Sequence, residues 1–231
     1  DPEQGGFSSV RMSIGACDFS SQKYYTYDDL PDGVAADAAL EHFSIGTGEP
    51  GAPDATRDMK NVVPVLQEIV SINPAVKIMA SPWSAPAWMK TFNRIDGSGR
   101  LRIGEYVGNG YRYQDTIDYV YAQYFVKFIE AYAKLGIHIT SVTMQNEPSN
   151  GCPWPITVWT PEELTKWGSE YLRPALDRAF PDVEIYFGDD SLRFWQRPVS
   201  EYMTPAQAQC YAGAAFHTYS GLPTWVHNGT R

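Results

Sequence analysis

The sequence predicts an α/β protein that forms part of a (β/α)8 TIM barrel. Short apolar segments alternate with helical patterns, and polar residues follow several of the apolar segments directly. Such alternation builds either an open doubly wound sheet or a closed barrel. A dinucleotide-binding sheet carries a glycine-rich fingerprint directly after its first strand, but "CDFSSQ" stands there, and GxxxxGK[ST] does not occur in the chain. The barrel is therefore the better prediction.

Five segments are predicted as strands because they are short, apolar and followed by small or polar residues. In chain order they are Val10–Ala16, Val76–Ala80, Ile139–Met144, Val183–Phe187 and Gly213–Phe216. Their nearly unbroken apolar character is typical of parallel strands that are buried on both faces. Since closure of this barrel needs eight strands, these segments predict an incomplete one.

Helical patterns separate the strands. Asp58–Ile72 has apolar residues at helical spacing, and Pro64 is expected to kink it or to lie within its first turns. Tyr113–Leu135 has one continuous apolar face. Thr160–Phe180 opens with "TPEE", the pattern of a capping box with proline at the first helical position, and Thr204 begins a similar start signal.

Composition and charge narrow the class of protein. The 231 residues are 43% hydrophobic and 19% charged, and no linker divides them, so residues 1–231 are expected to form a single incomplete domain. A net charge of −9 argues against nucleic acid or an anionic membrane as partner. No apolar run approaches the roughly 20 residues of a membrane span. The three cysteines lack the spacing of a metal or redox motif, so no metal is expected.

Polar residues gather where the predicted strands end. They are Asp18, Ser81-Pro82-Trp83-Ser84, Asn146-Glu147, Asp189-Asp190, and His217 with Tyr219. In a barrel, the carboxyl ends of the strands meet at one rim, where active sites lie. Polar groups of these types suit the cleavage of a glycoside.

Cleavage of an acetal needs a carboxylic acid to protonate the leaving oxygen and a second carboxylate as nucleophile or base. Glu147, within "ITSVTMQNEPSNG", is the candidate acid, and partial burial is expected to raise its pKa toward about 6. Asn146 is expected to hydrogen-bond a sugar hydroxyl. The competing interpretation is a solvated strand end at which Pro148 starts a turn.

Five motifs, in order along the chain, carry a resemblance to a known family. They are "VRMSIGACDFS", "SQKYYTYDD", "KIMASPWSAPAWMKT", "TMQNEP" and "FHTY". Together they closely resemble glycoside hydrolase family 30, which includes acid β-glucosidases (glucosylceramidases) and microbial β-1,6-glucanases. The resemblance implies a retaining (β/α)8 hydrolase that uses Glu147 as acid/base and needs no cofactor.

The resemblance also assigns substrate contacts. Asn146 would contact the hydroxyl next to the anomeric carbon. The glucose pocket would be lined by Arg11, Asp18, Trp83, His217 and Tyr219. Because an unpaired charge is costly to bury, Arg11 either pairs with a carboxylate inside the barrel or marks a shifted strand, and pairing with a catalytic carboxylate is the favoured expectation.

Simpler roles compete with several of these assignments. Asp18 is also suited to capping a turn, and Tyr219 to filling the rim. His217 is assigned to binding rather than to acid–base work, because histidines are more often packed or hydrogen-bonded than catalytic. Asp189 and Asp190 resemble an acid pair or a metal pair, but one of them is expected to cap the following helix.

The resemblance places the nucleophile, a Glu on the seventh strand, outside this sequence. The final residues, "SGLPTWVHNGTR", contain no carboxylate side chain. The chain is thus expected to hold strands 2 to 6 of the barrel, without the first, seventh and eighth strands and without the family's side β-domain. An unclosed sheet exposes its edges and apolar surface, so this polypeptide alone is expected to be marginally stable, prone to associate and inactive.

The predicted activity is cleavage of a β-glucosyl bond, as in glucosylceramidases. The alternatives are a β-1,6-glucanase of the same family, a sugar-binding barrel without catalysis, and a metal-dependent hydrolase that uses Asp189, Asp190 and His217. A β-glucoside or glucan is the expected partner. The sequon Asn228-Gly229-Thr230 fits secretion, and the resemblance extends this expectation to a secreted or lysosomal location.

Overall fold

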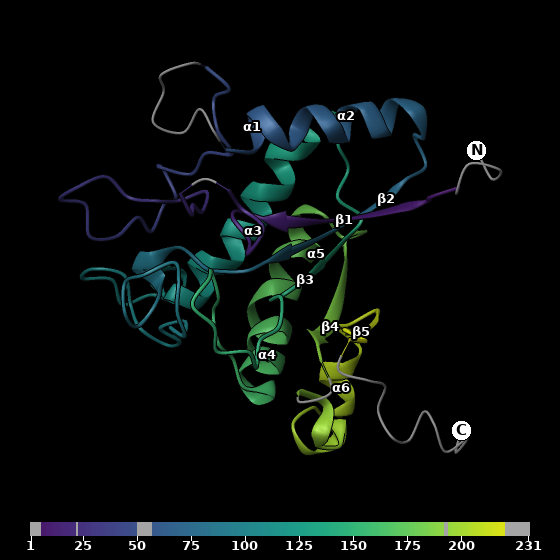
Figure 1. The fold of residues 1–231 in the computed structure, drawn as a ribbon. Coiled ribbons are helices and arrows are strands. Elements are labelled where there is room, and N and C mark those ends of the chain that lie inside the picture. Colours follow the sequence, from purple (N-terminus) through teal and green to yellow (C-terminus); the bar gives the residue numbers. More distant parts are fainter. Residues whose placement is uncertain (1–5, 22, 50–56, 192–193, 220–231) are drawn as a thin grey trace.

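The structure is a computed structural model that describes residues 6–21, 23–49, 57–191 and 194–219. Its centre is a five-stranded parallel sheet in which each strand pairs with the next along the chain (Figure 1). The strands are β1 (Ser9–Ile14), β2 (Lys77–Pro82), β3 (Ser141–Thr143), β4 (Glu184–Asp190) and β5 (Gly213–Phe216). Sequential parallel order with helices between the strands is an arc of a (β/α)8 barrel, so the predicted partial barrel is confirmed.

All five predicted strands are present, and the last has the predicted bounds. The first strand ends before Gly15, because that residue takes a left-handed φ of +77°. The third strand is shorter than predicted. The fourth continues beyond Phe187 to Asp190 through a bulge at which the register with β5 shifts.

The single helix predicted over residues 58–72 is wrong. Two helices, α1 (Asp58–Asn61) and α2 (Val63–Ile72), meet at Val62. Pro64 lies in the first turn of α2, where its missing N–H is not needed. Inside a continuous helix, the same proline would remove a hydrogen bond and clash with the preceding turn.

Helix α3 (Ile117–Ala133) begins later than predicted. Thr116 caps it by accepting the N–H of Tyr119 at 3.3 Å, and Tyr113–Asp115 form the separate 3₁₀ turn η3. The predicted apolar face is confirmed. Its fully buried aromatic side chains are Tyr121, Tyr124, Phe125, Phe128 and Tyr132.

The helical region predicted over 160–180 is interrupted by a wide turn. It consists of α4 (Pro161–Trp167), the π-helical turn η4 (Gly168–Leu172) and α5 (Arg173–Ala179). The capping box at Thr160 is confirmed. Pro174 cannot donate a backbone hydrogen bond, and Arg173 donates its N–H to the carbonyl of Gly168, five residues back. A Cβ at Gly168 would lie 2.4 Å from Met144 Sδ, so this turn packs closely against the end of β3.

Four short helical segments complete the described chain. They are η2 (Ala87–Met89), η5 (Phe194–Gln196), η6 (Val199–Glu201) and α6 (Pro205–Ala208). The start signal at Thr204 is confirmed, because its hydroxyl accepts the N–H of Gln207. None of the helices in the described part of the chain has both the length and the hydropathy of a membrane span.

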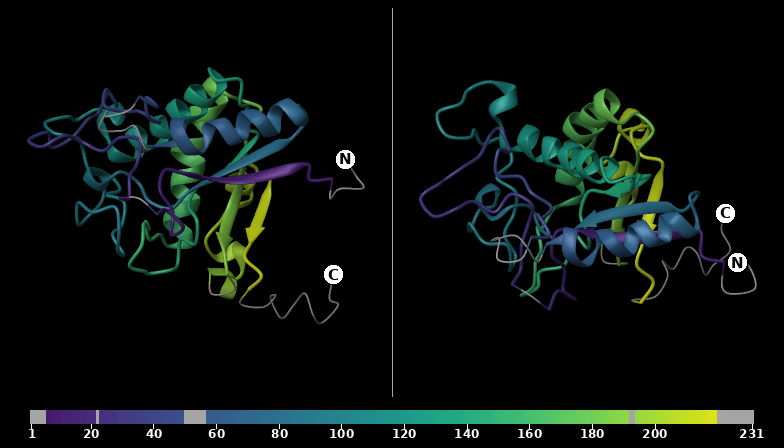
Figure 2. Two further views of the ribbon diagram at one scale, coloured as in Figure 1. Left: turned by 45° about the horizontal axis from the view of Figure 1, so that its top comes forward. Right: turned by 90° about the horizontal axis from the view of Figure 1, so that it is seen from above.

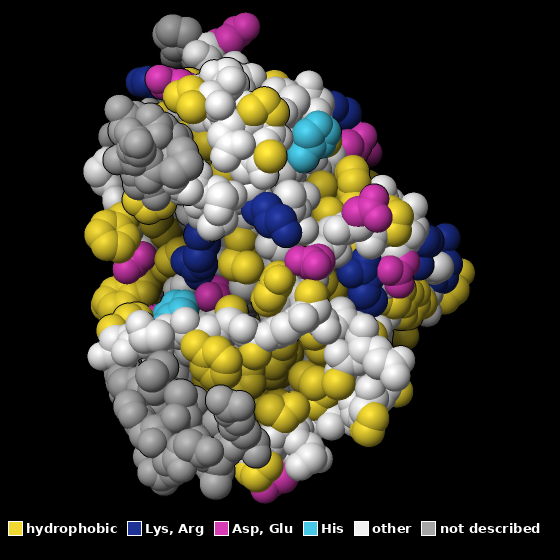
Figure 3. Space-filling view, turned by 90° about the vertical axis from the view of Figure 1, so that its right-hand side faces the viewer, with side chains coloured by type: hydrophobic (Ala, Val, Ile, Leu, Met, Phe, Trp, Pro, Cys, Tyr) yellow, Lys and Arg dark blue, Asp and Glu magenta, His cyan; other side chains and the backbone are white. Residues whose placement is uncertain are grey.

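Helices α2, α3 and α5 follow the outer side of the curved sheet (Figure 1, Figure 2). The central strand β3 is fully buried, whereas β1 and β5 include exposed residues. Within the ranges that the structure describes, β1 and β5 do not pair with each other, so the sheet has two open edges. Figure 3 shows hydrophobic side chains gathered across the middle of one face, beside acidic, basic and histidine side chains.

A buried carboxylate joins the first helix to the core. Asp58 is 1% exposed and accepts hydrogen bonds from the hydroxyls of Tyr25, Tyr27 and Tyr132. Burial raises the pKa of Asp58, although the three tyrosine hydrogen bonds oppose the shift. Burial also raises the pKa of each tyrosine, so all three keep their protons and depend on Asp58 as acceptor.

Replacement of Asp58 by alanine is expected to lower the free energy of unfolding by about 3 kcal/mol or more. Three hydroxyls lose their acceptor, and each unsatisfied buried donor costs roughly 1–3 kcal/mol. Urea unfolding of the protein that carries this chain measures the loss. The control is Asp177→Ala, which removes an exposed carboxylate bonded to Arg173 and should cost less than about 1 kcal/mol. Equal losses in the two variants would contradict the prediction.

Candidate active site

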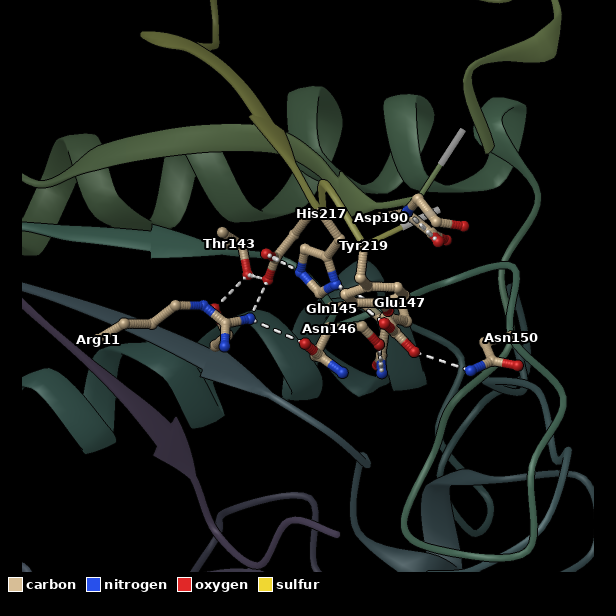
Figure 4. A network of polar contacts seen from close by, with 12 residues as sticks. Arg11, Thr143, Gln145, Asn146, Glu147, Asn150, Asp190, His217 and Tyr219 are labelled. Atoms are coloured by element: carbon tan, nitrogen blue, oxygen red, sulfur yellow. Dashed lines mark hydrogen bonds and ion pairs between the residues drawn. The ribbon is translucent and has the colours of Figure 1, made fainter. Parts of the chain in front are cut away.

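Polar side chains from β1, β4 and the segments after β3 and β5 meet at the carboxyl ends of the strands. In Figure 4, Arg11, Asn146, Glu147 and His217 point toward one another, and dashed lines connect them to further polar groups. This rim is where (β/α)8 enzymes hold their catalytic groups. The structure thus brings together four of the residues that the sequence singled out.

The backbone after β3 is fixed by both neighbouring strands. Asn146 donates its N–H to the carbonyl of Pro82 at 2.8 Å, and Glu147 donates its N–H to the carbonyl of Asp189 at 2.9 Å. Glu147 has a left-handed φ of +49°, which is unfavourable for a residue with a side chain. Such a backbone persists only where its surroundings determine it, and it is most frequent at functional sites.

The carboxylate of Glu147 is held between two partners. Its Oε1 lies 2.9 Å from Nδ1 of His217, and its Oε2 accepts a hydrogen bond from Nδ2 of Asn150 at 2.7 Å. The side chain of Glu147 is 13% exposed. The carboxylate therefore has a fixed orientation and still meets solvent at the rim.

His217 lies between two carboxylates. Its Nε2 is 2.9 Å from Oδ1 of Asp189, while its Nδ1 faces Glu147. Burial alone would lower the pKa of His217, but hydrogen bonds to Asp189 and Glu147 raise that pKa to about 9. Near neutral pH the imidazole is therefore protonated on both nitrogens and donates to both carboxylates.

The pKa of Glu147 is shifted in the direction opposite to the prediction. Partial burial was expected to raise it toward about 6. The hydrogen bond from His217 is instead the largest influence, and the pKa of Glu147 is lowered despite burial. The expectation was wrong because a cationic imidazole, from a residue 70 positions along the chain, stabilises the ionised carboxylate.

Arg11 connects the first strand to this network. Its Nη2 donates to Oδ1 of Asn146 at 2.8 Å and to Oδ2 of Asp189 at 2.7 Å. Its guanidinium carbon lies 5.2 Å from the centre of the Trp83 ring, which is within cation–π range. The expected pairing with a carboxylate is confirmed, but the partner is Asp189 and not the candidate acid Glu147. With Oδ1 of Asn146 engaged by Arg11, the amide of Asn146 presents its NH₂ group as the remaining donor.

Asp18 and Tyr219 lie farther out on the rim. Asp18 is exposed, and its side chain forms no hydrogen bond with the residues that the structure describes. Burial is the main cause that raises the pKa of the Cys152 thiol to about 11, and the negative charges of Glu147 and Asp18 add to the shift. The three groups therefore lie near the same rim. Tyr219 is 71% exposed, and its hydroxyl lies 3.2 Å from Nδ1 of His217.

The sequence interpretation missed the position of Asp189. It expected one aspartate of the pair to cap the following helix, whereas Asp190 accepts the N–H of Ser149, on the segment after β3, at 2.8 Å through its Oδ2. Asp189 instead faces Arg11. The available signal was Gly188, because glycine inside a strand pattern often marks a bulge, which breaks the alternation of side chains.

The three side chains of the alternative metal-dependent hydrolase, Asp189, Asp190 and His217, do not point toward a common position. Asp189 and His217 bond to each other, whereas Asp190 bonds to the backbone of Ser149 and Ser191. Within the described ranges, no group of three or more His, Cys, Asp or Glu side chains is arranged to hold a metal ion.

Comparison with known proteins agrees with the fold. Residues 3–229 match the model of the glycosyl hydrolase family 30 TIM-barrel domain. The endo-1,6-β-D-glucanase neg1 of Aspergillus fumigatus is 33% identical over 97% of this chain and 44% of its own length. The lysosomal acid glucosylceramidase of Mus musculus is 31% identical over 92% of this chain and 38% of its own length. The chain thus spans less than half the length of these curated relatives.

Solved structures give the same result. The endo-β1,6-glucanase BT3312 superimposes with a TM-score of 0.77 at 30% identity, over 96% of this chain and 45% of that chain. SrfJ from Salmonella typhimurium superimposes with a TM-score of 0.74 at 29% identity, over 93% of this chain and 42% of that chain. The family model covers all of the described residues that form the parallel sheet and its polar rim. The chain therefore belongs to glycosyl hydrolase family 30, and its sheet is an arc of that family's TIM-barrel domain.

Proposed function

We propose that this chain carries the acid/base side of a retaining β-glycosidase site, with Glu147 as the acid/base. The observation that carries the proposal is the position of Glu147, which stands beside the Asn146 amide at the end of β3 and is held there by His217 and Asn150. Family membership supports a glycosidase activity for the protein that contains the chain.

Glu147 acts in both steps of the proposed reaction. It first gives its proton to the glycosidic oxygen while a second carboxylate attacks the anomeric carbon and forms a glycosyl-enzyme. It then accepts a proton from the water that displaces the enzyme carboxylate, which restores the starting state. The protonated His217 favours the ionised form of Glu147, and this assists the second step.

The neighbouring side chains are proposed to bind the sugar. The NH₂ group of Asn146 would donate to the hydroxyl next to the anomeric carbon, in an orientation fixed by Arg11. Hydrogen bonds to that hydroxyl strengthen in the transition state of glycoside hydrolysis. The remaining proposed pocket residues are Asp18, Trp83, His217 and Tyr219.

The proposed substrate has a β-glucosyl bond, as in glucosylceramide. A β-1,6-glucan is the alternative, because relatives named for either activity match the chain with similar identity. A sugar-binding barrel without catalysis is the second alternative.

Parallel assays with glucosylceramide in detergent micelles and with β-1,6-glucan decide between the two substrates. Sugar binding without hydrolysis of either substrate would support the second alternative.

A secreted or lysosomal location is also proposed. The pKa of Glu147 is lowered, so its acid form is most abundant in an acidic medium. This agrees with the name of the lysosomal relative.

Replacement of Glu147 by glutamine is expected to lower kcat/KM by about 10²–10⁴-fold on an unactivated β-glucoside, in the protein that carries this chain. The loss should shrink strongly on a dinitrophenyl glucoside, because that leaving group departs without protonation. Glu105→Gln, which changes an exposed carboxylate bonded to Arg102, is the matched control and should keep both rates. Equal losses on the two substrates would count against an acid role.

Replacement of His217 by asparagine is expected to move the basic limb of the pH profile of kcat/KM to higher pH. That limb reports loss of the Glu147 proton. The imidazolium lowers the pKa of Glu147, so a neutral amide in its place lets that pKa rise. An aryl β-glucoside assayed between about pH 4 and 9 provides the profile. A limb that stays in place, or moves to lower pH, would refute this account of His217.

We also propose that the nucleophile, a Glu on the seventh strand of the barrel, lies outside residues 1–231. The 231-residue chain alone is then expected to release no product from an aryl β-glucoside, because a general acid without a nucleophile cannot form the glycosyl-enzyme. A longer protein that includes the nucleophile should turn over. Turnover by the 231-residue chain that disappears in Glu147→Gln would overturn this proposal.

A further inference from the structure

One buried carboxylate lies at the centre of the polar network. Asp189 is 2% exposed. Its Oδ2 accepts hydrogen bonds from Arg11 at 2.7 Å and from the hydroxyl of Thr143 at 2.6 Å, and its Oδ1 lies 2.9 Å from Nε2 of His217. Three donors from three different segments therefore converge on a single side chain.

The backbone of β4 is shaped to place this carboxylate. Gly188 and Asp189 have φ values of +93° and +58°, and the register with β5 shifts between Gly188 and Asp190. A Cβ at Gly188 would lie 2.0 Å from the ring of Trp195, so only glycine fits there. The resulting bulge re-aims the next side chain, as bulges beside active sites commonly do.

We propose that Asp189 is a positioning residue for the pair Asn146 and Glu147. It orients Asn146 through Arg11 and Glu147 through His217, so that one carboxylate sets the geometry of both. This inference rests on the proposed function of Glu147. It adds a residue that does not itself touch the sugar, and it explains why two side chains with different tasks share one support.

Backbone and side-chain contacts lead from Asp189 to the same pair. Its carbonyl accepts the N–H of Glu147 at 2.9 Å, while its carboxylate reaches Glu147 through the imidazole of His217. On the other side, the same Nη2 atom of Arg11 that donates to Asp189 also donates to Asn146. A displacement of Asp189 would therefore move both members of the pair.

The contacts of Asp189 exclude a nucleophilic role for it. Both of its oxygens are already bonded, and its side chain is only 3% exposed. Burial would raise its pKa, but the donors around it, led by His217, lower the pKa and keep it ionised. Asp189 is thus a fixed negative charge, and an attack on an anomeric carbon would require it to abandon Arg11, Thr143 and His217.

Charges alternate along the network. The order is Glu147, His217, Asp189 and Arg11, which is anion, cation, anion, cation. Among the described residues, two other titratable residues contact His217: the hydroxyl of Tyr219 faces Nδ1, and the backbone carbonyl of Asp190 accepts the backbone N–H of His217. Loss of the Asp189 charge would leave two cations with one carboxylate and would destabilise the imidazolium.

The test measures protonation and catalysis separately. Ring NMR signals of labelled histidine give the pKa of His217 in the protein that carries this chain, for wild type, Asp189→Asn and Asp190→Asn. In the wild type that pKa is expected at about 9. Asp189→Asn should lower it by about one unit or more, because an opposite charge in contact is lost. Asp190→Asn is the matched control, and it should leave the His217 pKa close to the wild-type value.

Kinetics provide the second readout. Asp189→Asn is expected to lower kcat on a β-glucoside about 10²-fold or more, with a smaller change in KM, since partners that orient catalytic groups act mainly in the transition state. Asp189→Glu keeps the charge at a shifted position, so it should keep a high His217 pKa and still lose kcat. A merely structural role would change thermal stability while the His217 pKa and kcat stayed at wild-type values.

Two results would overturn the inference. One is a His217 pKa that is the same in Asp189→Asn and wild type. The other is a kcat in Asp189→Glu that equals the wild-type value. This second result can be obtained even if Asp189→Asn does not fold. If the wild-type protein hydrolyses no β-glycoside, the proposed function fails, and the histidine titration still decides whether Asp189 holds His217 in its protonated, oriented form.

Discussion

The need to neutralise a buried charge organises the polar rim of this sheet. A carboxylate removed from water must be surrounded by donors, because the cost of desolvation exceeds what one hydrogen bond returns. Asp189 satisfies this need with a guanidinium, a hydroxyl and an imidazolium. Each of these donors has a second contact, with Asn146, Ser81 and Glu147 respectively. The surroundings of one charge therefore set the positions of groups from four strands and the segments that follow them.

Much of the fold could be predicted because its signals are local. Apolar runs mark the strands, and the capping boxes at Thr160 and Thr204 begin helices where expected. Pro64 was expected to kink its helix or to lie in the first turns, but the separate helix before Val62 and the wide turn at Gly168 were missed for a common reason. Proline excludes a regular helix nearby, but whether the chain responds with a new helix or a wide turn depends on packing against distant elements, which local patterns do not contain.

The site was predictable to the extent that its residues lie in recognisable motifs. Arg11, Asn146, Glu147 and His217 do, and the structure brings them together. The central position of Asp189 depends on a bulge and on contacts between remote segments. The direction of the Glu147 pKa shift depends on a neighbour's charge as well as on burial. Neither property is encoded in a short stretch of sequence, because both arise from the relative placement of three strands.

The left-handed backbone at Glu147 lowers the stability of the fold at a position where the proposed activity needs a carboxylate. A residue with a side chain pays a conformational cost at a φ of +49°, and glycine would not. Selection for a more stable fold alone would therefore favour glycine at position 147, at the loss of the carboxylate. Persistence of glutamate there requires selection for its chemistry, and a copy of this domain released from that selection would be free to exchange the acid for a more stable strand end.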